Sequence, residues 1–105
     1  MNKIAIIMPV YNGEEYLDES IQSVLNQTYK DFQLICVNDS STDSSLEILN
    51  KYKEQDSRVV VLTKENAGPG EALNYGIKNS QSEYLCFIDQ DDKYASDYLE
   101  TMYYY

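Results

Sequence analysis

Histidine is absent from this chain of 105 residues, and cysteine is scarce. Without an imidazole there is no Ser-His or Cys-His catalysis, no histidine general base and no histidine-rich zinc site. Acid or base chemistry must therefore come from carboxylates, tyrosine or lysine. The two cysteines, Cys36 and Cys86, lie far apart, each within an apolar run, so there is no zinc or Cys-x-x-Cys pattern. We expect both to be buried, inert thiols.

Positive charge is also in short supply, because 8 basic residues face 18 acidic ones and the formal net charge is −10. This balance argues against nucleic acid or an anionic membrane surface as a partner, although a metal ion could still recruit an anionic substrate. No apolar run approaches the ~18 residues of a membrane-spanning helix, and no signal peptide is evident. We therefore expect a cytoplasmic location and no membrane span, with residues 1–105 forming a single domain.

Apolar runs alternate with amphipathic segments along the chain. The runs predict strands, and the segments with a period near 3.6 predict helices. The expected strands are residues 4–8, 32–37, 58–62 and 84–88. The expected helices are residues 14–28, 44–52, 69–78 and 94–102. Alternating strands and helices with short connections predict an α/β fold, namely a doubly wound parallel sheet of four strands with helices on both faces.

Three local features refine these predicted strands and helices. Pro9 is expected to stop the first strand, because it cannot donate to a strand ladder. Ser44 and Glu47 match a capping box for the second helix. Gly76 either weakens the third helix or marks close packing.

The most polar junction of the chain lies where the fourth expected strand ends. Residues 84–88 are apolar, as in a strand buried on both faces, and Asp89, Asp91 and Asp92 follow. At the carboxyl end of a parallel strand, these acids would face the ligand crevice of an α/β sheet. Carboxylates crowded there repel one another, and a divalent ion that also binds substrate phosphates is the usual compensation. The alternative is that they cap the next helix, although one Asp suffices for a cap.

Two further strand ends carry residues suited to ligand binding. Pro9, Val10 and Tyr11 follow the first apolar run, and Asn38 and Asp39 follow the second. If all strands are parallel, these ends share one edge with the acids, where an aromatic ring and polar groups could bind a base while the acids hold metal and phosphate. The alternatives are a packing role for the aromatic ring and a turn role for the aspartate. No Gly-x-Gly-x-x-Gly or P-loop sequence occurs, which disfavours those two modes of phosphate binding.

Several of these motifs, in the same order, resemble the family 2 inverting glycosyltransferases with the GT-A fold. The stretches that carry the likeness are residues 6–17, 20–28, 37–43, 66–68 and 89–91. Residues 37–43 are similar to the Asn-Asp-Gly-Ser-Thr-Asp motif of that family, and residues 89–91 to its Asp-x-Asp motif. The likeness spans nearly the whole chain and implies a Rossmann-like sheet in the order 3-2-1-4. That order would place Cys36 and Cys86 beyond disulfide reach.

The resemblance also implies a partner and a cofactor, namely a nucleotide-diphosphate sugar, usually of uridine, and Mn²⁺ or Mg²⁺. Pro9, Val10 and Tyr11 would line the pocket for the base, and Asp39 would hydrogen-bond it. Asp89 would contact the ribose or support the metal.

The second acid of the motif, Asp91, would coordinate the ion that bridges the diphosphate, where the ion acts as a Lewis acid. Asp92 would cap or orient the next helix.

Three features depart from the family pattern. Ser40 stands where the family usually has glycine, which matters if φ there is positive. Leu73 stands where many members have arginine. Family members also continue well past this length, into the part that binds the acceptor and carries the general base. The chain therefore resembles a truncated nucleotide-sugar-binding domain, its catalytic residue is unknown, and sugar transfer by these residues alone is not expected.

Two other functions stay open at this point. One is a catalytically silent fragment or assembly module that forms a homodimer through its C-terminal region, residues 102–105, with exchange of the last helix. The other is a receiver-like phosphoacceptor domain. Such a domain needs paired acids after its first strand, and residues 9–12 do not supply them.

Overall fold

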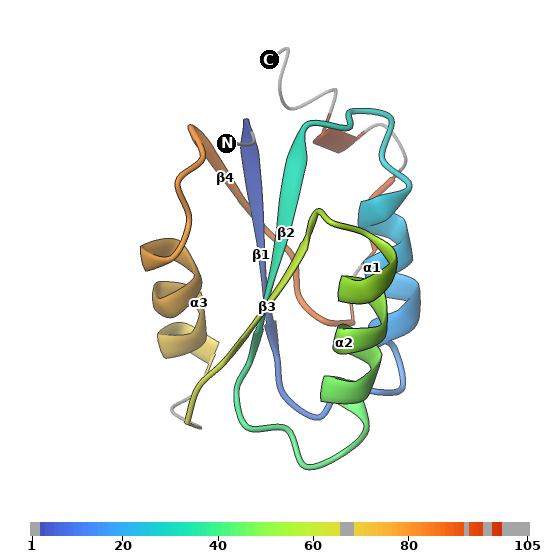
Figure 1. The fold of residues 1–105 in the computed structure, drawn as a ribbon, viewed down its shortest axis with the longest axis vertical. Coiled ribbons are helices and arrows are strands. Elements are labelled where there is room, and N and C mark those ends of the chain that lie inside the picture. Colours follow the sequence, from blue (N-terminus) through green and yellow to red (C-terminus); the bar gives the residue numbers. More distant parts are fainter. Residues whose placement is uncertain (1–2, 66–68, 92, 96–97, 100–105) are drawn as a thin grey trace.

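The computed structural model describes residues 3–65, 69–91, 93–95 and 98–99 (Figure 1). Strands and helices alternate along it as predicted. The elements are β1 Ile4–Val10, α1 Leu17–Leu25, β2 Phe32–Asn38, α2 Ser45–Gln55, β3 Val59–Thr63, α3 Pro69–Lys78 and β4 Tyr84–Phe87. No helix in the described part of the chain is long and apolar enough to cross a membrane.

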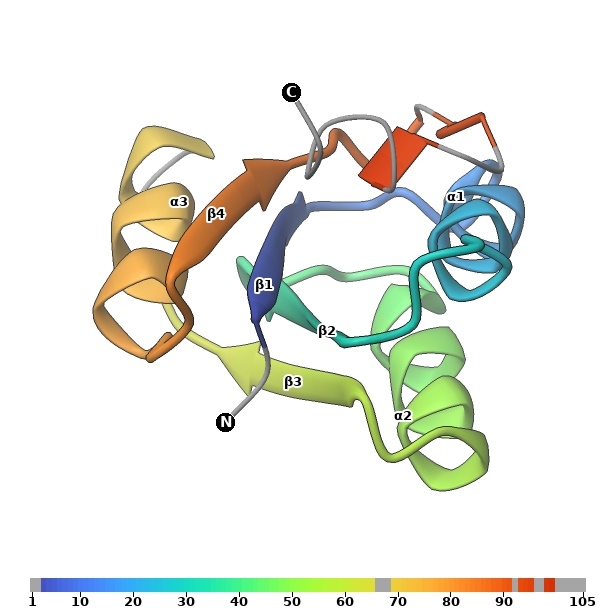
Figure 2. The ribbon, with the colours of Figure 1, turned by 90° about the horizontal axis from the view of Figure 1, so that it is seen from above.

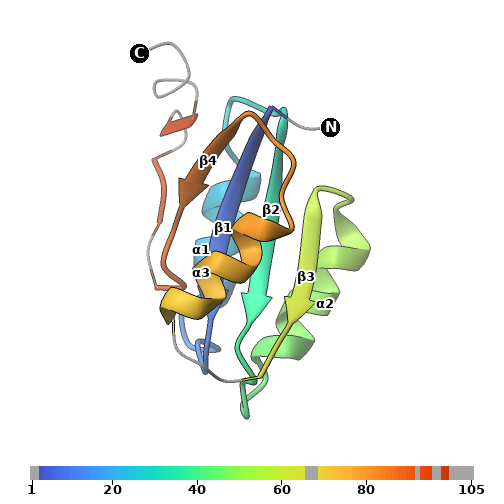
Figure 3. The same cartoon turned by 90° about the vertical axis from the view of Figure 1, so that its left-hand side faces the viewer.

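All four strands are parallel and lie in the order β3-β2-β1-β4, as the resemblance implied (Figure 3). β1 is central and pairs with β2 along its whole length. Cys36 on β2 and Cys86 on β4 lie on either side of β1 and are free thiols, as predicted. Burial raises the pKa of Cys36 to about 12, as expected of an inert thiol, whereas Cys86 is only half-buried.

Helices cover both faces of the sheet, as predicted (Figure 2). Ile6 and Met8 of β1 belong to the core on the α1 and α2 face, while Ala5 and Ile7 belong to the core on the α3 face. This alternation follows from the two-residue period of a strand. Leu73, which stands where the resembled family often has arginine, lies half-buried against the α3-face core.

β1 does not stop before Pro9, and the prediction of a strand end there is wrong. Residues along a strand direct their backbone groups to alternate neighbours. The Val10 carbonyl faces β2, where it accepts a hydrogen bond from the Asp39 N–H (2.8 Å), so Pro9 faces the β4 side. β4 pairs with β1 only as far as Ile7. The missing N–H of Pro9 therefore costs no ladder hydrogen bond, and the strand passes through it.

β4 lies at the edge of the sheet, and most of its side chains are exposed. The prediction of a strand buried on both faces is therefore wrong. Tyr84, Leu85 and Phe87 are 53%, 38% and 49% exposed. The register with β1 puts Leu85 and Phe87 on the α3 face, but α3 packs over β1 and β2. An apolar run shows that the residues are hydrophobic, but it does not show whether a helix covers them. The predicted burial of β4 failed for this reason.

The start of α2 is stabilised differently from the predicted capping box. Ser44 is the N-cap residue, but its side chain makes no capping hydrogen bond. The Asp43 carboxylate does so instead, because its Oδ1 accepts a hydrogen bond from the Ser45 N–H (2.9 Å).

The helix predicted over residues 94–102 is only partly within the described chain. Tyr94 and Ala95 are not helical, Tyr98 and Leu99 are, and residues 100–102 lie outside the described part. Leu99 is fully buried. The buried Gln27 of the α1 end holds this segment, because it donates to the Ala95 carbonyl (2.6 Å) and accepts from the Leu99 N–H (3.0 Å).

Candidate functional site

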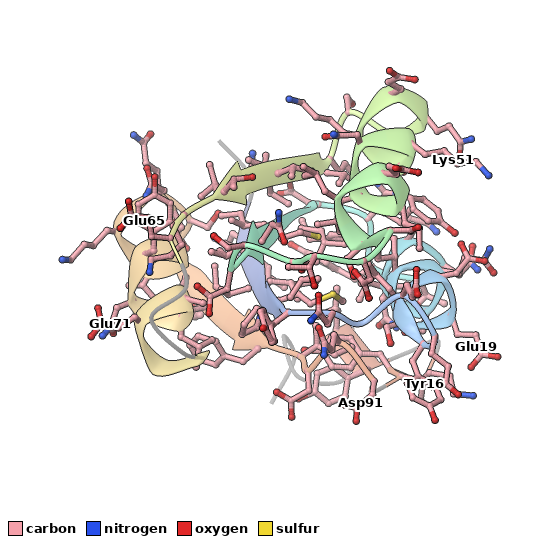
Figure 4. All side chains as sticks on the ribbon, turned by 90° about the horizontal axis from the view of Figure 1, so that it is seen from below. Tyr16, Glu19, Lys51, Glu65, Glu71 and Asp91 are labelled. Carbon is pink, nitrogen blue, oxygen red and sulfur yellow. The ribbon has the colours of Figure 1, made fainter. Side chains whose placement is uncertain are left out.

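The carboxyl ends of the strands meet at one edge of the sheet, which Figure 4 views end-on. At the end of β1, Val10 is fully buried, Pro9 is half-buried and Tyr11 is 46% exposed. Tyr11 is therefore not a core aromatic, and its ring is accessible to a ligand. Val10 can contribute only to the floor beneath it.

At the end of β2, Asp39 is 3% exposed and lies deep between the ends of β1 and β3. Its N–H bond to the Val10 carbonyl extends the β1–β2 pairing by one residue. Ser40 follows with a φ of 58°, so the serine in place of the usual glycine does fall on a left-handed residue. Its hydroxyl donates to the Lys64 carbonyl (2.7 Å), which ties this turn to the end of β3.

A set of hydrogen bonds, here called the inter-loop network, joins residues 12–14 after β1 to residues 41–45 after β2. Asn12 is its centre, because its Oδ1 accepts from the N–H groups of Thr42 (2.7 Å) and Asp43 (3.3 Å) and its own N–H donates to Ser41 Oγ (3.1 Å). Asn12 has a φ of 49°, a conformation that asparagine adopts more readily than most residues. Tyr11 and Asp39 are thereby held in a fixed relation.

The rest of the inter-loop network surrounds the start of α2. The Gly13 N–H donates to Ser45 Oγ (2.9 Å), the Glu14 N–H to Asp43 Oδ2 (3.2 Å) and the Ser44 N–H to Glu14 Oε2 (3.0 Å). Burial raises the pKa of Asp43, but the hydrogen bonds from the Ser45 hydroxyl and N–H and from the Glu14 N–H outweigh this and lower it overall. The ionised carboxylate can therefore accept from both loops at neutral pH.

The acids after β4 lie beside the end of β1. Asp89 and Asp91 are both exposed, and Gln90 between them is half-buried. The Gln90 side-chain amide accepts from the Tyr11 N–H (2.7 Å) and donates to the Tyr11 carbonyl (2.9 Å). Figure 4 labels Asp91 at this edge of the sheet. Asp92, the expected helix cap, lies outside the described residues.

The donor set at this edge can be compared with what metal ions require. Two carboxylates in one exposed turn suit a hard divalent ion that keeps water and phosphate oxygens in the rest of its shell. Among the described residues, no group of three or more Asp, Glu, Cys or His side chains is placed to hold an ion by itself. The residues therefore fit Mg²⁺ or Mn²⁺ bound together with a diphosphate better than a site built from protein alone.

Sequence reasoning placed Pro9, Val10, Tyr11, Asp39, Asp89 and Asp91, and the structure brings all of them to one edge. It missed the connecting residues Asn12, Asp43 and Gln90. The Asn12-Gly13 pair was an available signal, since Asn-Gly favours positive φ. No local pattern in the sequence indicated the role of Gln90, because its partner Tyr11 is 79 residues away in the sequence.

A four-stranded parallel sheet in this order, with helices on both faces, defines a Rossmann-like α/β domain of the GT-A type. The profile of glycosyl transferase family 2 matches residues 5–105, and the chain belongs to that family.

Known relatives and structures agree with this assignment. An uncharacterized glycosyltransferase of Haemophilus influenzae is 48% identical over 101 residues, covering 95% of this chain and 40% of the relative. A poly(ribitol-phosphate) beta-glucosyltransferase of Bacillus spizizenii is 46% identical over 105 residues, covering 96% of this chain and 17% of the relative. The crystal structure of S. aureus TarS residues 1–349 in complex with UDP is 31% identical, with a TM-score of 0.90, and covers 97% of this chain and 31% of that one. The chain thus spans less than half the length of each of these proteins.

Proposed function

We propose that this chain is the donor-nucleotide part of a family 2 glycosyltransferase, which binds a nucleotide-diphosphate sugar, with uridine as the base, through a divalent ion for inverting sugar transfer. The observation that carries the proposal is the turn after β4, where exposed Asp89 and Asp91 flank a residue that is hydrogen-bonded to Tyr11. The likeness to TarS, which has been crystallised with UDP and with UDP-GlcNAc, supports it.

In this proposal, the ends of β1 and β2 bind the nucleoside. The exposed ring of Tyr11 borders the base, with Pro9 and Val10 behind it. Asp39 accepts a hydrogen bond from the base, and Asp89 contacts the ribose or supports the metal. The inter-loop network holds these groups in place before the ligand arrives, which reduces the cost of ordering them on binding.

Asp91, with Asp89, would hold Mn²⁺ or Mg²⁺. An ion at that position neutralises the charge that grows on the leaving nucleoside diphosphate as the sugar departs. The two carboxylates, in a chain with a net charge of −10, repel a diphosphate in the absence of a cation. Nucleotide binding is therefore expected to depend on the metal.

The acceptor site and the general base are assigned to no residue of this chain. We propose that transfer to an acceptor belongs to a longer polypeptide, of which these residues are the donor-binding part. The cytoplasmic location and the homodimer through residues 102–105 stay predictions.

Titration calorimetry with UDP, with and without Mn²⁺, tests this function. We expect Mn²⁺ to raise the affinity of the parent chain for UDP, and we expect Asp91→Asn to reduce that gain by roughly tenfold or more, because loss of even an outer-shell metal partner commonly costs that much. Glu54→Gln is the control, since it removes one negative charge from an exposed position near the end of α2.

A parent chain that binds UDP equally well with and without Mn²⁺, or not at all, would contradict the proposal. An equal loss in Asp91→Asn and Glu54→Gln would show that net charge, and not a metal ligand, governs binding.

A further inference from the structure

Gln90 makes three hydrogen bonds to parts of the chain far from it in the sequence. Its side-chain Oε1 and Nε2 bond the N–H and the carbonyl of Tyr11 (2.7 and 2.9 Å). Its main-chain carbonyl accepts a hydrogen bond from Ser20 Oγ on α1 (2.6 Å). One residue thus joins the turn after β4, the loop after β1 and the helix that follows it.

The side-chain amide replaces strand pairing at the point where that pairing has ended. β4 pairs with β1 no further than Ile7, and Pro9 has no N–H to offer on that side. Tyr11 is the next residue in the same alternation, and the Gln90 amide presents to it one acceptor and one donor, as a neighbouring strand would. Tyr11 is thereby fixed although no β4 backbone lies beside it.

The space for this amide depends on a glycine. A Cβ added at Gly13 would lie 2.5 Å from Gln90 Oε1 and 2.6 Å from Gln90 Cδ, both too close for real contacts. Gly13 is buried and belongs to the inter-loop network through its N–H bond to Ser45 Oγ. Any side chain at Gly13 must therefore displace the amide from Tyr11.

We propose that Gln90 is a positioning residue that couples the nucleoside side of the site to its metal side. This inference rests on the proposed function and names how its two halves act together. Tyr11 lies on the nucleoside side, Asp89 and Asp91 lie on the metal side, and the Gln90 amide holds the two at a fixed separation. When that link is lost, the metal and the base no longer reinforce each other, because each loop must be ordered separately on binding.

Gln90→Met tests the coupling, because methionine keeps the length of the side chain and removes both amide hydrogen bonds. The quantity measured is the ratio of the Kd for UDP without Mn²⁺ to the Kd with saturating Mn²⁺. We expect this ratio to fall by about tenfold, the size expected for the loss of two hydrogen bonds, while the metal-free Kd changes little. Gln55→Met at the exposed end of α2 is the matched control and should leave the ratio unchanged.

Gly13→Ala reaches the same amide from the other side and covers the case in which Gln90→Met fails to fold. Its methyl group meets the flexible end of Gln90, so it should displace the amide and lower the same ratio. An unchanged ratio in a folded variant overturns the inference, and so does an equal loss of affinity with and without Mn²⁺, which would indicate a purely structural role. The parent chain is measured first. If it shows no Mn²⁺-dependent binding of UDP, the proposed function fails, whereas normal parent behaviour with an unchanged ratio in the variants overturns only the coupling.

Discussion

Ser40 occupies a backbone conformation that suits glycine better than serine. Its φ of 58° lies in the left-handed region, where a side chain costs roughly 1–2 kcal/mol. Its hydroxyl offsets part of that cost, because it donates to the Lys64 carbonyl at 2.7 Å. The serine therefore has a strained backbone, and its hydroxyl forms a hydrogen bond that ties the turn after β2 to the end of β3.

Two substitutions at this position should separate strain from hydrogen bonding. Ser40→Ala keeps the strain and loses the bond, so it should lower the free energy of unfolding by about 1 kcal/mol. Ser40→Gly loses the bond and removes the strain, so it should be more stable than Ser40→Ala by about 1 kcal/mol. Chemical denaturation followed by circular dichroism measures both. At Ser57, where φ is not left-handed, alanine should be at least as stable as glycine, and the same order at both sites would refute the strain argument.

At the scale of elements, α3 approaches the sheet through a glycine. A Cβ at Gly76 would lie 2.6 Å from Ile7 Cγ2 and 3.2 Å from Val37 Cγ2, both on the central strands. Of the two roles that the sequence left open for Gly76, close packing is the correct one. Among the described residues, nothing outside the adjoining backbone of the helix lies within 4 Å of a Cβ added at Gly70 in the same helix.

The two glycines of α3 should therefore respond to alanine with opposite signs. Gly76→Ala gains about 1 kcal/mol of helix propensity but overpacks the core by about 1–3 kcal/mol, so a net loss of stability is expected. Gly70→Ala gains propensity without a clash and should stabilise the chain by up to about 1 kcal/mol. Urea midpoints of both variants give the comparison. A Gly76→Ala protein as stable as the parent would mean that α3 moves away from the sheet at little cost.

At the scale of the whole molecule, the two sides of the sheet differ in how well they are covered. The chain has two phenylalanines, both on strands. Phe32 on β2 is fully buried, with the Arg58 guanidinium 4.4 Å from its ring centre, while Phe87 on β4 is 49% exposed. Leu85 shares this uncovered part of the α3 face. An identical substitution at the two positions therefore reports how completely each region is packed.

Phe32→Ala should lower the free energy of unfolding by about 3–5 kcal/mol, whereas Phe87→Ala should change it by no more than about 1 kcal/mol. Denaturation at two protein concentrations, tenfold apart, checks this. A large cost for Phe87→Ala that grows with concentration would mean that this edge is covered by another copy of the chain in solution.

Most of the fold followed from local patterns, and the errors fall where a neighbour in space decides. The apolar runs and helical periods located every described strand and helix, because packing helices on both faces of a sheet imposes those periods directly. Pro9 was predicted to end the first strand, yet it lies within β1. The prediction failed because only the order of the strands reveals that the side of Pro9 without an N–H faces the place where β4 has already ended. The apolar run at residues 84–88 predicted a strand buried on both faces, but among the described residues no helix covers the α3 face of β4.

The candidate site divides in the same way. The sequence alone determined that Tyr11, Asp39, Asp89 and Asp91 follow strands, and parallel strands of one sheet must bring such residues to one edge. Only the tertiary structure decided how these residues are connected. Hydrogen bonds such as those of Gln90 to Tyr11 form between loops 79 residues apart, and their geometry depends on where the sheet places both loops. Residue types and their spacing are local properties of a chain, whereas the fit of an amide into the space left by Gly13 is a property of the folded molecule alone.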